Sequence, residues 1–129
     1  MMIQHVLLVM AMQERFPELV HGKDYFVAHP LDRETGEQSG DAYIDTWHGP
    51  GDQPDIAPLL KRAEELRPDH AMADVRWKRN TLLSSSDWTQ APDVPQAVRD
   101  KWIPYRQALR DLTEQPNFPF DVNWPEVPR

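Results

Sequence analysis

Histidines, carboxylates and serines are the side chains that most often carry chemistry, and in this sequence they are scattered. The five histidines are His5, His21, His29, His48 and His70. No two of them stand three or four residues apart, the spacing at which one helix face presents two metal ligands. His29 and His48 could face each other across a hairpin, but a zinc site needs three or four convergent ligands. We therefore interpret the histidines as surface or turn residues and expect no metal site.

The carboxylates and serines do not indicate catalysis either. Asp41 and Asp45 fall in one predicted strand and could act as a catalytic pair, but solvent-facing hairpin charges are the preferred interpretation. No serine lies in a nucleophile-elbow pattern, so Ser84–Ser86 is interpreted as a helix end or the cap of the next turn. No glycine-rich phosphate loop is present. The sequence predicts no enzymatic activity and no cofactor.

The composition is that of an ordinary globular protein with an acidic balance. Its 129 residues allow one domain or two very small ones, and the net charge of -7 argues against nucleic acid or an anionic membrane as partner. The absence of cysteine excludes a disulfide framework and fits a cytoplasmic protein. The apolar run at residues 6–12 is too short to cross a membrane, so we interpret it as a buried element.

Two helices are predicted in the first half of the chain. Residues 3–15 could form a helix or a strand. We prefer a helix that ends at Phe16, because the next residue is proline and disfavours α geometry before it. Residues 55–66 carry a clear apolar stripe, and either Asp52 or Asp55 can cap the helix that this stripe predicts.

Between these helices the sequence predicts a β-hairpin. Residues 24–31 and 41–48 are rich in aromatic and β-branched side chains, and the polar segment 32–40 suits a connecting loop. In the second strand, Ala42, Ile44 and Thr46 are expected on one face and Tyr43, Asp45 and Trp47 on the other. A two-stranded sheet needs both helices for cover, so we assign residues 1–67 to a small α+β unit.

The second half predicts a helical hairpin. A helix is expected from about Asp69 to Ser84, and a corner follows at residues 88–95. The next helix has the strongest periodicity of the chain, through Val98, Trp102, Tyr105, Leu109 and Leu112. Pro104 lies within it, so this helix either kinks or restarts with Asp100 as its N-cap.

The fold class expected for the whole chain is therefore α+β. A helix–β-hairpin–helix unit would be followed, in residues 68–129, by a helical hairpin with an extended, proline-rich tail. Seven of the 13 prolines lie from Pro92 onward, and proline favours short helices and stiff extended pieces.

Several short blocks of the second half, in this order, resemble one protein family. They are Arg79-x-x-Leu82-Leu83, Ser86-Asp87-Trp88-Thr89-Gln90, Trp102-x-x-Tyr105-Arg106-Gln107-Ala108-Leu109, Gln115-Pro116-x-Phe118-Pro119 and Trp124-Pro125. From about Val75 to Pro128, the chain resembles the phage tail assembly chaperone module of tailed phages and prophages. Asn80 and Pro104 depart from that family, which usually has an acidic residue and a helix former there.

The first half is similar, more weakly, to the small XkdW-type tail-region proteins of prophages. The similarity lies in R-F-P-E-L-V at Arg15–Val20, G-K-D-Y at Gly22–Tyr25 and Y-I-D-T-W at Tyr43–Trp47. Little is known of what that family does, so this similarity adds context only.

The resemblance implies a tail or tail-fibre assembly chaperone that acts by binding a phage tail or tail-fibre protein. Such a protein would work in the host cytoplasm during assembly. The alternative is a structural component that stays in the virion, attached to the tail tip or tail fibre. A third hypothesis is a small acidic protein directed at a host factor.

Aromatic side chains are the first candidates for binding the partner. Trp88 and Trp124 are predicted in loop or extended segments, and tryptophan is enriched at interface hot spots. We add Phe118, in the predicted tail, as a further contact residue. Trp102 and Tyr105 are instead expected in the core of the helical hairpin, together with Leu109.

Two arginines complete the predicted binding site. Arg106 and Arg110 lie one helical turn apart and could face an acidic partner. Alternatively, they could pair with nearby aspartates, namely Asp87, Asp93 or Asp111. Asp87 and Asp93 are expected to serve the fold rather than the partner.

Overall fold

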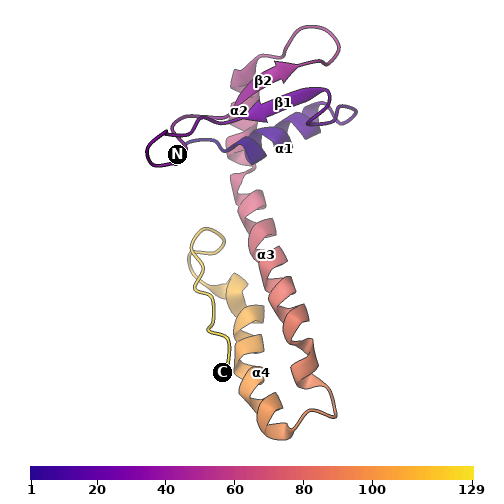
Figure 1. The fold of residues 1–129 in the computed structure, drawn as a ribbon, viewed down its shortest axis with the longest axis vertical. Helices are drawn as coiled ribbons and strands as arrows, with labels where there is room; N and C mark the ends of the chain where they lie inside the picture. The colour runs from indigo at the N-terminus through magenta and orange to yellow at the C-terminus, as the bar shows by residue number, and fades with distance from the viewer. The chain divides into compact units, whose positions relative to one another are not determined.

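The computed structural model describes residues 1–129, which divide into two compact units. We call Met1–Arg67 the N-terminal unit and Pro68–Arg129 the C-terminal unit. The chain combines helices with one two-stranded antiparallel sheet, so the expected α+β class is confirmed (Figure 1). None of the helices combines the length and the apolar composition that crossing a membrane requires.

Helix α1 spans His5–Arg15, so the preferred helical interpretation of this segment is confirmed. Its inner face is formed by Leu7, Leu8, Ala11 and Met12, all of them buried. The helix stops because Phe16, which precedes a proline, leaves the α region with φ -126° and ψ 66°.

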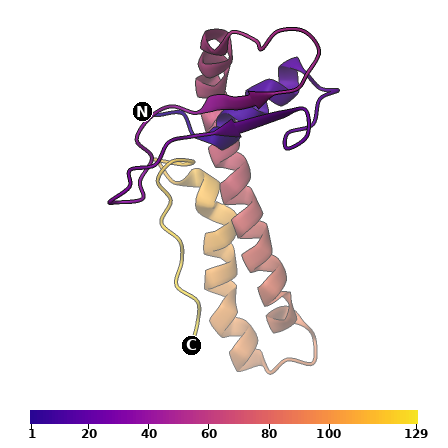
Figure 2. The ribbon, with the colours of Figure 1, turned by 45° about the horizontal axis from the view of Figure 1, so that its top comes forward.

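Strands β1 (Tyr25–Ala28) and β2 (Tyr43–Trp47) pair antiparallel (Figure 2). Helices α1 and α2 contribute side chains to the same core as the sheet. The buried face of the hairpin carries Tyr25, Val27 and Ile44. Phe26 and Tyr43 are exposed on the opposite face. The alternation that predicted the two strands therefore holds over most of the hairpin.

The alternation fails at one point in β2. Val27 pairs with Ile44 but Phe26 pairs with Thr46, so Asp45 is an extra residue and forms a β-bulge. Beyond the bulge the faces are the reverse of those predicted. Thr46 lies opposite the exposed Phe26, and Trp47 lies opposite the buried Tyr25.

Trp47 consequently joins the core of the N-terminal unit. Its ring stacks on Tyr25 at 6.4 Å between centroids and packs on Phe16 at 5.4 Å. Gly49 makes room for this placement, because a Cβ atom there would come within 2.5 Å of the indole. The indole N–H donates to the carbonyl oxygen of Gly51 at 3.1 Å.

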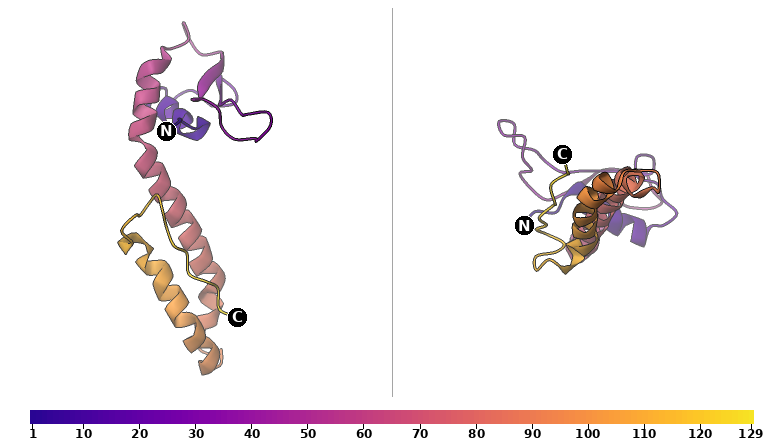
Figure 3. Two further views of the ribbon diagram at one scale, coloured as in Figure 1. Left: turned by 90° about the vertical axis from the view of Figure 1, so that its left-hand side faces the viewer. Right: turned by 90° about the horizontal axis from the view of Figure 1, so that it is seen from below.

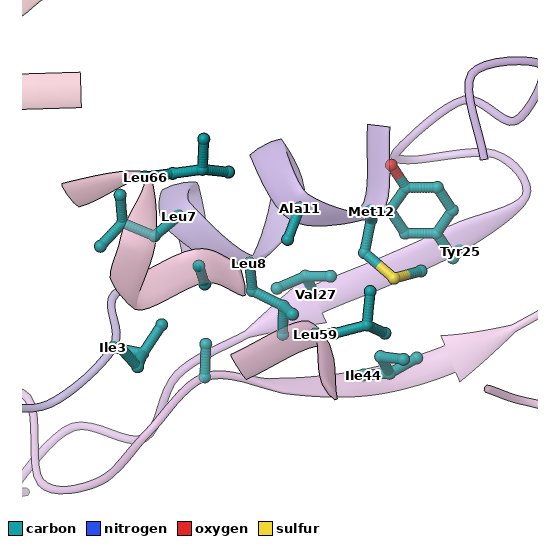
Figure 4. Close-up of a cluster of buried hydrophobic side chains, with 12 residues drawn as sticks. Ile3, Leu7, Leu8, Ala11, Met12, Tyr25, Val27, Ile44, Leu59 and Leu66 are labelled. Carbon is teal, nitrogen blue, oxygen red and sulfur yellow. The ribbon is translucent and has the colours of Figure 1, made fainter. Parts of the chain in front are cut away.

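Helix α2 spans Ile56–Glu65, and of the two predicted caps it is Asp55 that accepts a hydrogen bond, from the backbone N–H of Ala57. Leu59 and Ala63 of α2 are buried in the same core as residues of α1 and the sheet. Figure 4 shows Leu59 beside Val27 and Ile44 of the two strands. On the surface, Arg62 of α2 binds Glu14 of α1 through two hydrogen bonds of 2.8 and 2.9 Å. This arginine lowers the pKa of the Glu14 carboxyl.

The C-terminal unit contains two long helices and two short 3-10 turns. These are α3 (Arg67–Ser86), η1 (Asp87–Gln90), α4 (Gln96–Arg110) and η2 (Asp111–Glu114). Helix α4 runs through Pro104 without interruption, so of the two alternatives for this region the restart at Asp100 is wrong. Its N-cap is Pro95.

The core of the C-terminal unit lies between α3 and α4. Its buried centre consists of Tyr105, Leu109 and Leu112, and the partly buried residues around it are Val75, Leu82, Leu83, Trp102, Val122 and Trp124. The expected core role of Tyr105 and Leu109 therefore agrees with their burial. Val122 and Trp124 belong to the segment after η2, which runs back along the helix pair (Figure 3).

The segment after Glu114 contains no further helix or strand. Its course is held by the side chain of Gln115, which bonds both backbone groups of Asn123. The amide nitrogen of Gln115 donates to the Asn123 carbonyl oxygen at 2.9 Å, and its amide oxygen accepts from the Asn123 N–H at 2.8 Å.

Candidate protein-binding site

Arg106 is a buried side chain of α4 that fastens the helix to the end of α3. Its guanidinium donates to the carbonyl oxygen of Leu83 at 2.9 Å, to the hydroxyl of Ser86 at 2.6 Å and to the carboxylate of Asp87 at 2.8 Å. The structure thus favours the pairing alternative over contact with an acidic partner. Arg106 was predicted as a contact residue, but burial and three internal partners leave it little surface for one.

Three aromatic rings extend from this anchor toward solvent, and we call Trp88, Trp102 and Tyr105 the aromatic row. Trp88 meets Trp102 edge-on at 6.0 Å between centroids, and Trp102 meets Tyr105 edge-on at 5.5 Å. Burial increases along the row, from Trp88 with 58% of its surface exposed to Tyr105 with 6%. Trp88 is therefore an exposed indole that rests on a fixed support.

Trp124 is half-buried rather than fully exposed. It packs on the core of the C-terminal unit, and the ammonium group of Lys78 lies 4.4 Å from the centre of its ring. Phe118 is also half-buried, whereas Phe120 nearby exposes 62% of its surface. Trp124 thus attaches the final segment to α3, through packing and a cation–π contact.

Arg110 and Asp93 are both exposed, and neither takes part in an ion pair. Arg110 is therefore free to meet a partner, and its role as a contact residue stays a prediction. Asp93, predicted as structural, forms no side-chain hydrogen bond that would give it such a role. Asp87 does have a structural contact, the ion pair with Arg106.

The predicted contact residues do not form a single patch. Trp88 packs on Trp102, in the middle of α4, whereas Phe118 follows the C-terminal end of this helix. The aromatic row therefore lies along the middle of α4, and Phe118 lies beyond its C-terminal end.

One exposed aromatic residue was not singled out by sequence reasoning. Trp77 of α3 exposes 72% of its surface and lines a shallow groove that is widely open to solvent. The other residues that line the groove are Asn80, Thr81, Ser84 and Ser85. The signal in the sequence was that Trp77 stands beside the apolar stripe of its helix and not in it.

The polar residues considered for chemistry lie elsewhere. No group of three or more histidine, aspartate or glutamate side chains is arranged to hold a metal. The ring neighbour of His29 is His5, at 4.8 Å between centroids, and not His48 as considered for the hairpin. Asp41 accepts a hydrogen bond from the backbone N–H of Ile3, and Asp45 accepts one from the hydroxyl of Thr46.

Comparison with known families agrees with the two resemblances. Residues 72–129 match the family described as phage tail assembly chaperone protein, and residues 8–71 match the family described as XkdW protein. Both predicted resemblances are confirmed, and the two matches meet within α3. The chain is thus similar in its C-terminal part to phage tail assembly chaperone proteins, and in its N-terminal part to XkdW proteins. No curated protein and no solved structure matches it.

Proposed function

We propose that this protein is a phage tail assembly chaperone that binds a tail or tail-fibre protein without catalysing a reaction. The observation that carries this proposal is the family match over residues 72–129. We further propose that binding takes place in the host cytoplasm, before the client enters the tail. The two compact units would act as separate domains, with the C-terminal unit making the contact.

The aromatic row supplies a physical basis for binding. Trp88 presents a large apolar surface, and an exposed indole gains free energy when a partner covers it. Because Trp102 supports it from behind, Trp88 loses little side-chain freedom on binding. Arg106 contributes indirectly, since it holds the end of α3 against α4 and so fixes the base of the row.

A first experiment separates a chaperone from a structural virion component. Deleting the gene from an inducible prophage should give defective or absent tails, because the client would aggregate or misassemble. Mass spectrometry of purified wild-type particles should not find the protein at a stoichiometric level. Stoichiometric recovery with the particle would favour the alternative, a subunit retained at the tail tip or fibre. Intact tails together with a co-purifying host protein would favour the third hypothesis.

A second experiment tests the aromatic row. Trp88→Ala should leave the thermal midpoint nearly unchanged, because the side chain is mostly exposed, and should weaken co-purification with the co-expressed tail protein at least tenfold. Trp88→Phe is the matched control and should retain most of the binding. Wild-type binding by Trp88→Ala would show that the row is not the contact surface. Unlike Trp88→Ala, Trp124→Ala should lower the thermal midpoint, since Trp124 packs on the core.

A further inference from the structure

The most exposed large apolar side chain within a helix of this chain is that of Trp77, in the middle of α3. A single exposed hydrophobic residue is common on protein surfaces and needs no explanation. Trp77 differs because it stands at one end of a groove. The groove follows Trp77, Asn80 and Thr81, then Ser84 and Ser85, which is one face of α3 over about two turns.

The small residues of this groove suit close approach by another chain. Beyond the indole, no side chain larger than asparagine lines the groove. Two of the hydroxyls are already satisfied within α3, because Thr81 donates to the Trp77 carbonyl oxygen at 2.9 Å and Ser85 donates to that of Leu82 at 3.0 Å. A partner that covers these two hydroxyls would therefore not leave their donor groups without a hydrogen bond.

The charges beside the groove indicate what kind of segment would lie there. Arg76, Lys78 and Arg79 stand within four residues around Trp77, and none of them forms an ion pair. The guanidinium of Arg79 instead donates to the side-chain oxygen of Asn80 at 3.2 Å, at the rim of the groove. Lys78 lies over the ring of Trp124.

Two carboxylates on this helix stand against these three basic side chains. Asp74, one turn before Trp77, contacts His70 at 3.3 Å and keeps 70% of its side chain exposed, so it offsets part of the positive charge. Asp69 lies in the first turn of α3, about two turns from Trp77. Residues 76–79 thus keep an excess of positive charge beside the groove, although the protein as a whole carries a net charge of -7.

We propose that the face of α3 around Trp77 binds an acidic, amphipathic segment of the client protein. An apolar side chain of that segment would cover the indole, and its carboxylates would pair with Arg76 and Arg79. In this arrangement the buried tryptophan would supply most of the affinity. The complementary charges would set the association rate and the specificity. The proposal rests on the proposed function only in that the segment belongs to a phage tail protein.

A peptide experiment tests the surface without the client. The probe is a fluorescently labelled 18-residue helical peptide with leucines on one face and glutamates on the other, and the control peptide carries lysines in place of the glutamates. We expect the full-length protein to bind the glutamate peptide at least tenfold more tightly. The double variant Arg76→Glu/Arg79→Glu should remove this preference, and Trp77→Ala should weaken binding about tenfold at an unchanged thermal midpoint. Equal binding of the two peptides, or wild-type binding by Trp77→Ala, would overturn the proposal.

A crosslinking experiment in cells with an induced prophage separates this proposal from the proposed function. A photo-crosslinking phenylalanine analogue replaces Trp77, Trp88 or, as a control site, the exposed Ala97. Crosslinks from position 77, but not from 97, to an acidic stretch of a tail protein would support the proposal. Crosslinks from position 88 alone would overturn it and leave the proposed function standing. Crosslinks to a second copy of this chain would also overturn it, and the absence of any tail protein at all three positions would contradict both.

Discussion

At the scale of single residues, neighbours of the same chemical type have different environments. Arg106 and Arg110 lie one turn apart on α4, and the sequence allowed a partner contact or an internal ion pair for each. Arg106 is buried and bonded to the end of α3, whereas Arg110 is exposed. The outcome depends on how α4 is rotated against α3, which local sequence does not determine. Burial of Tyr105 and Leu109 was predictable, because their spacing defines the apolar stripe.

Tyr25 supports a prediction at this scale. Its hydroxyl is buried without a hydrogen-bond partner, and burial, together with the nearby charge of Asp24, raises its pKa. Tyr25→Phe should therefore increase the free energy of unfolding at pH 8 by about 1 kcal/mol, since an unsatisfied polar group is removed. Urea denaturation measures this change, with the exposed Tyr43→Phe as control. A loss of about 1 kcal/mol would indicate a hydrogen bond to the Tyr25 hydroxyl.

The same residue gives the protein a defined response to high pH. Because the pKa of Tyr25 is higher in the folded state than in the unfolded state, the folded state retains a proton that the unfolded state loses above about pH 10. Its contribution to stability is thus complete below pH 10 and is lost as the pH rises further. Between pH 9 and pH 11, the wild type should lose more stability than Tyr25→Phe. Parallel curves for the two proteins would contradict this expectation.

At the scale of elements, the helices were predictable and the details of the hairpin were not. Helices α2 and α4 are each encoded by a clear local apolar stripe, and α1 ends where Pro17 requires it. The bulge in β2 has no such local signal, because Asp45 and Thr46 fit a regular strand as well as a bulged one. The bulged register buries Trp47 beside Tyr25. Because this contact joins two different strands, the local sequence of β2 does not reveal it.

Pro104 allows the cost of an irregular helix to be measured. It lies within α4 and cannot donate a hydrogen bond to the carbonyl oxygen of Asp100. Because its side chain is exposed, Pro104→Ala should restore that bond without disturbing the core, and should increase the free energy of unfolding by about 1–2 kcal/mol. Chemical denaturation of the full-length protein is the measurement. Pro92→Ala, outside any helix, is the control and should give no gain.

At the scale of the whole molecule, each unit has its own core and its own charge balance. All buried core residues of the N-terminal unit lie between Ile3 and Leu66, and those of the C-terminal unit lie between Tyr105 and Leu112. The N-terminal unit carries 12 acidic against 6 basic residues, and the C-terminal unit 9 against 8. The negative charge that argued against nucleic-acid binding is therefore concentrated in the N-terminal unit.

Separate cores lead to a prediction about local stability. Leu8→Ala and Leu109→Ala each remove a fully buried side chain and should each cost about 2–5 kcal/mol. If the two units are separate domains, as we propose, each substitution should accelerate amide hydrogen exchange in its own unit only. Mass spectrometry of peptides from both units measures this. Faster exchange throughout the chain after either substitution would show that the units unfold together.

The bulge at Asp45 also affects how this chain is aligned with its relatives. Since Asp45 has no partner in β1, a strand without it would pair Ile44 and Thr46 with Val27 and Phe26 in unbroken order. Every other side chain of β2 would keep its face, and Trp47 would remain in the core. Position 45 is thus where this strand can gain or lose one residue while its other side chains stay on their own faces of the sheet, buried or exposed. A gap opened elsewhere in residues 43–47 would assign the wrong side chains to the core.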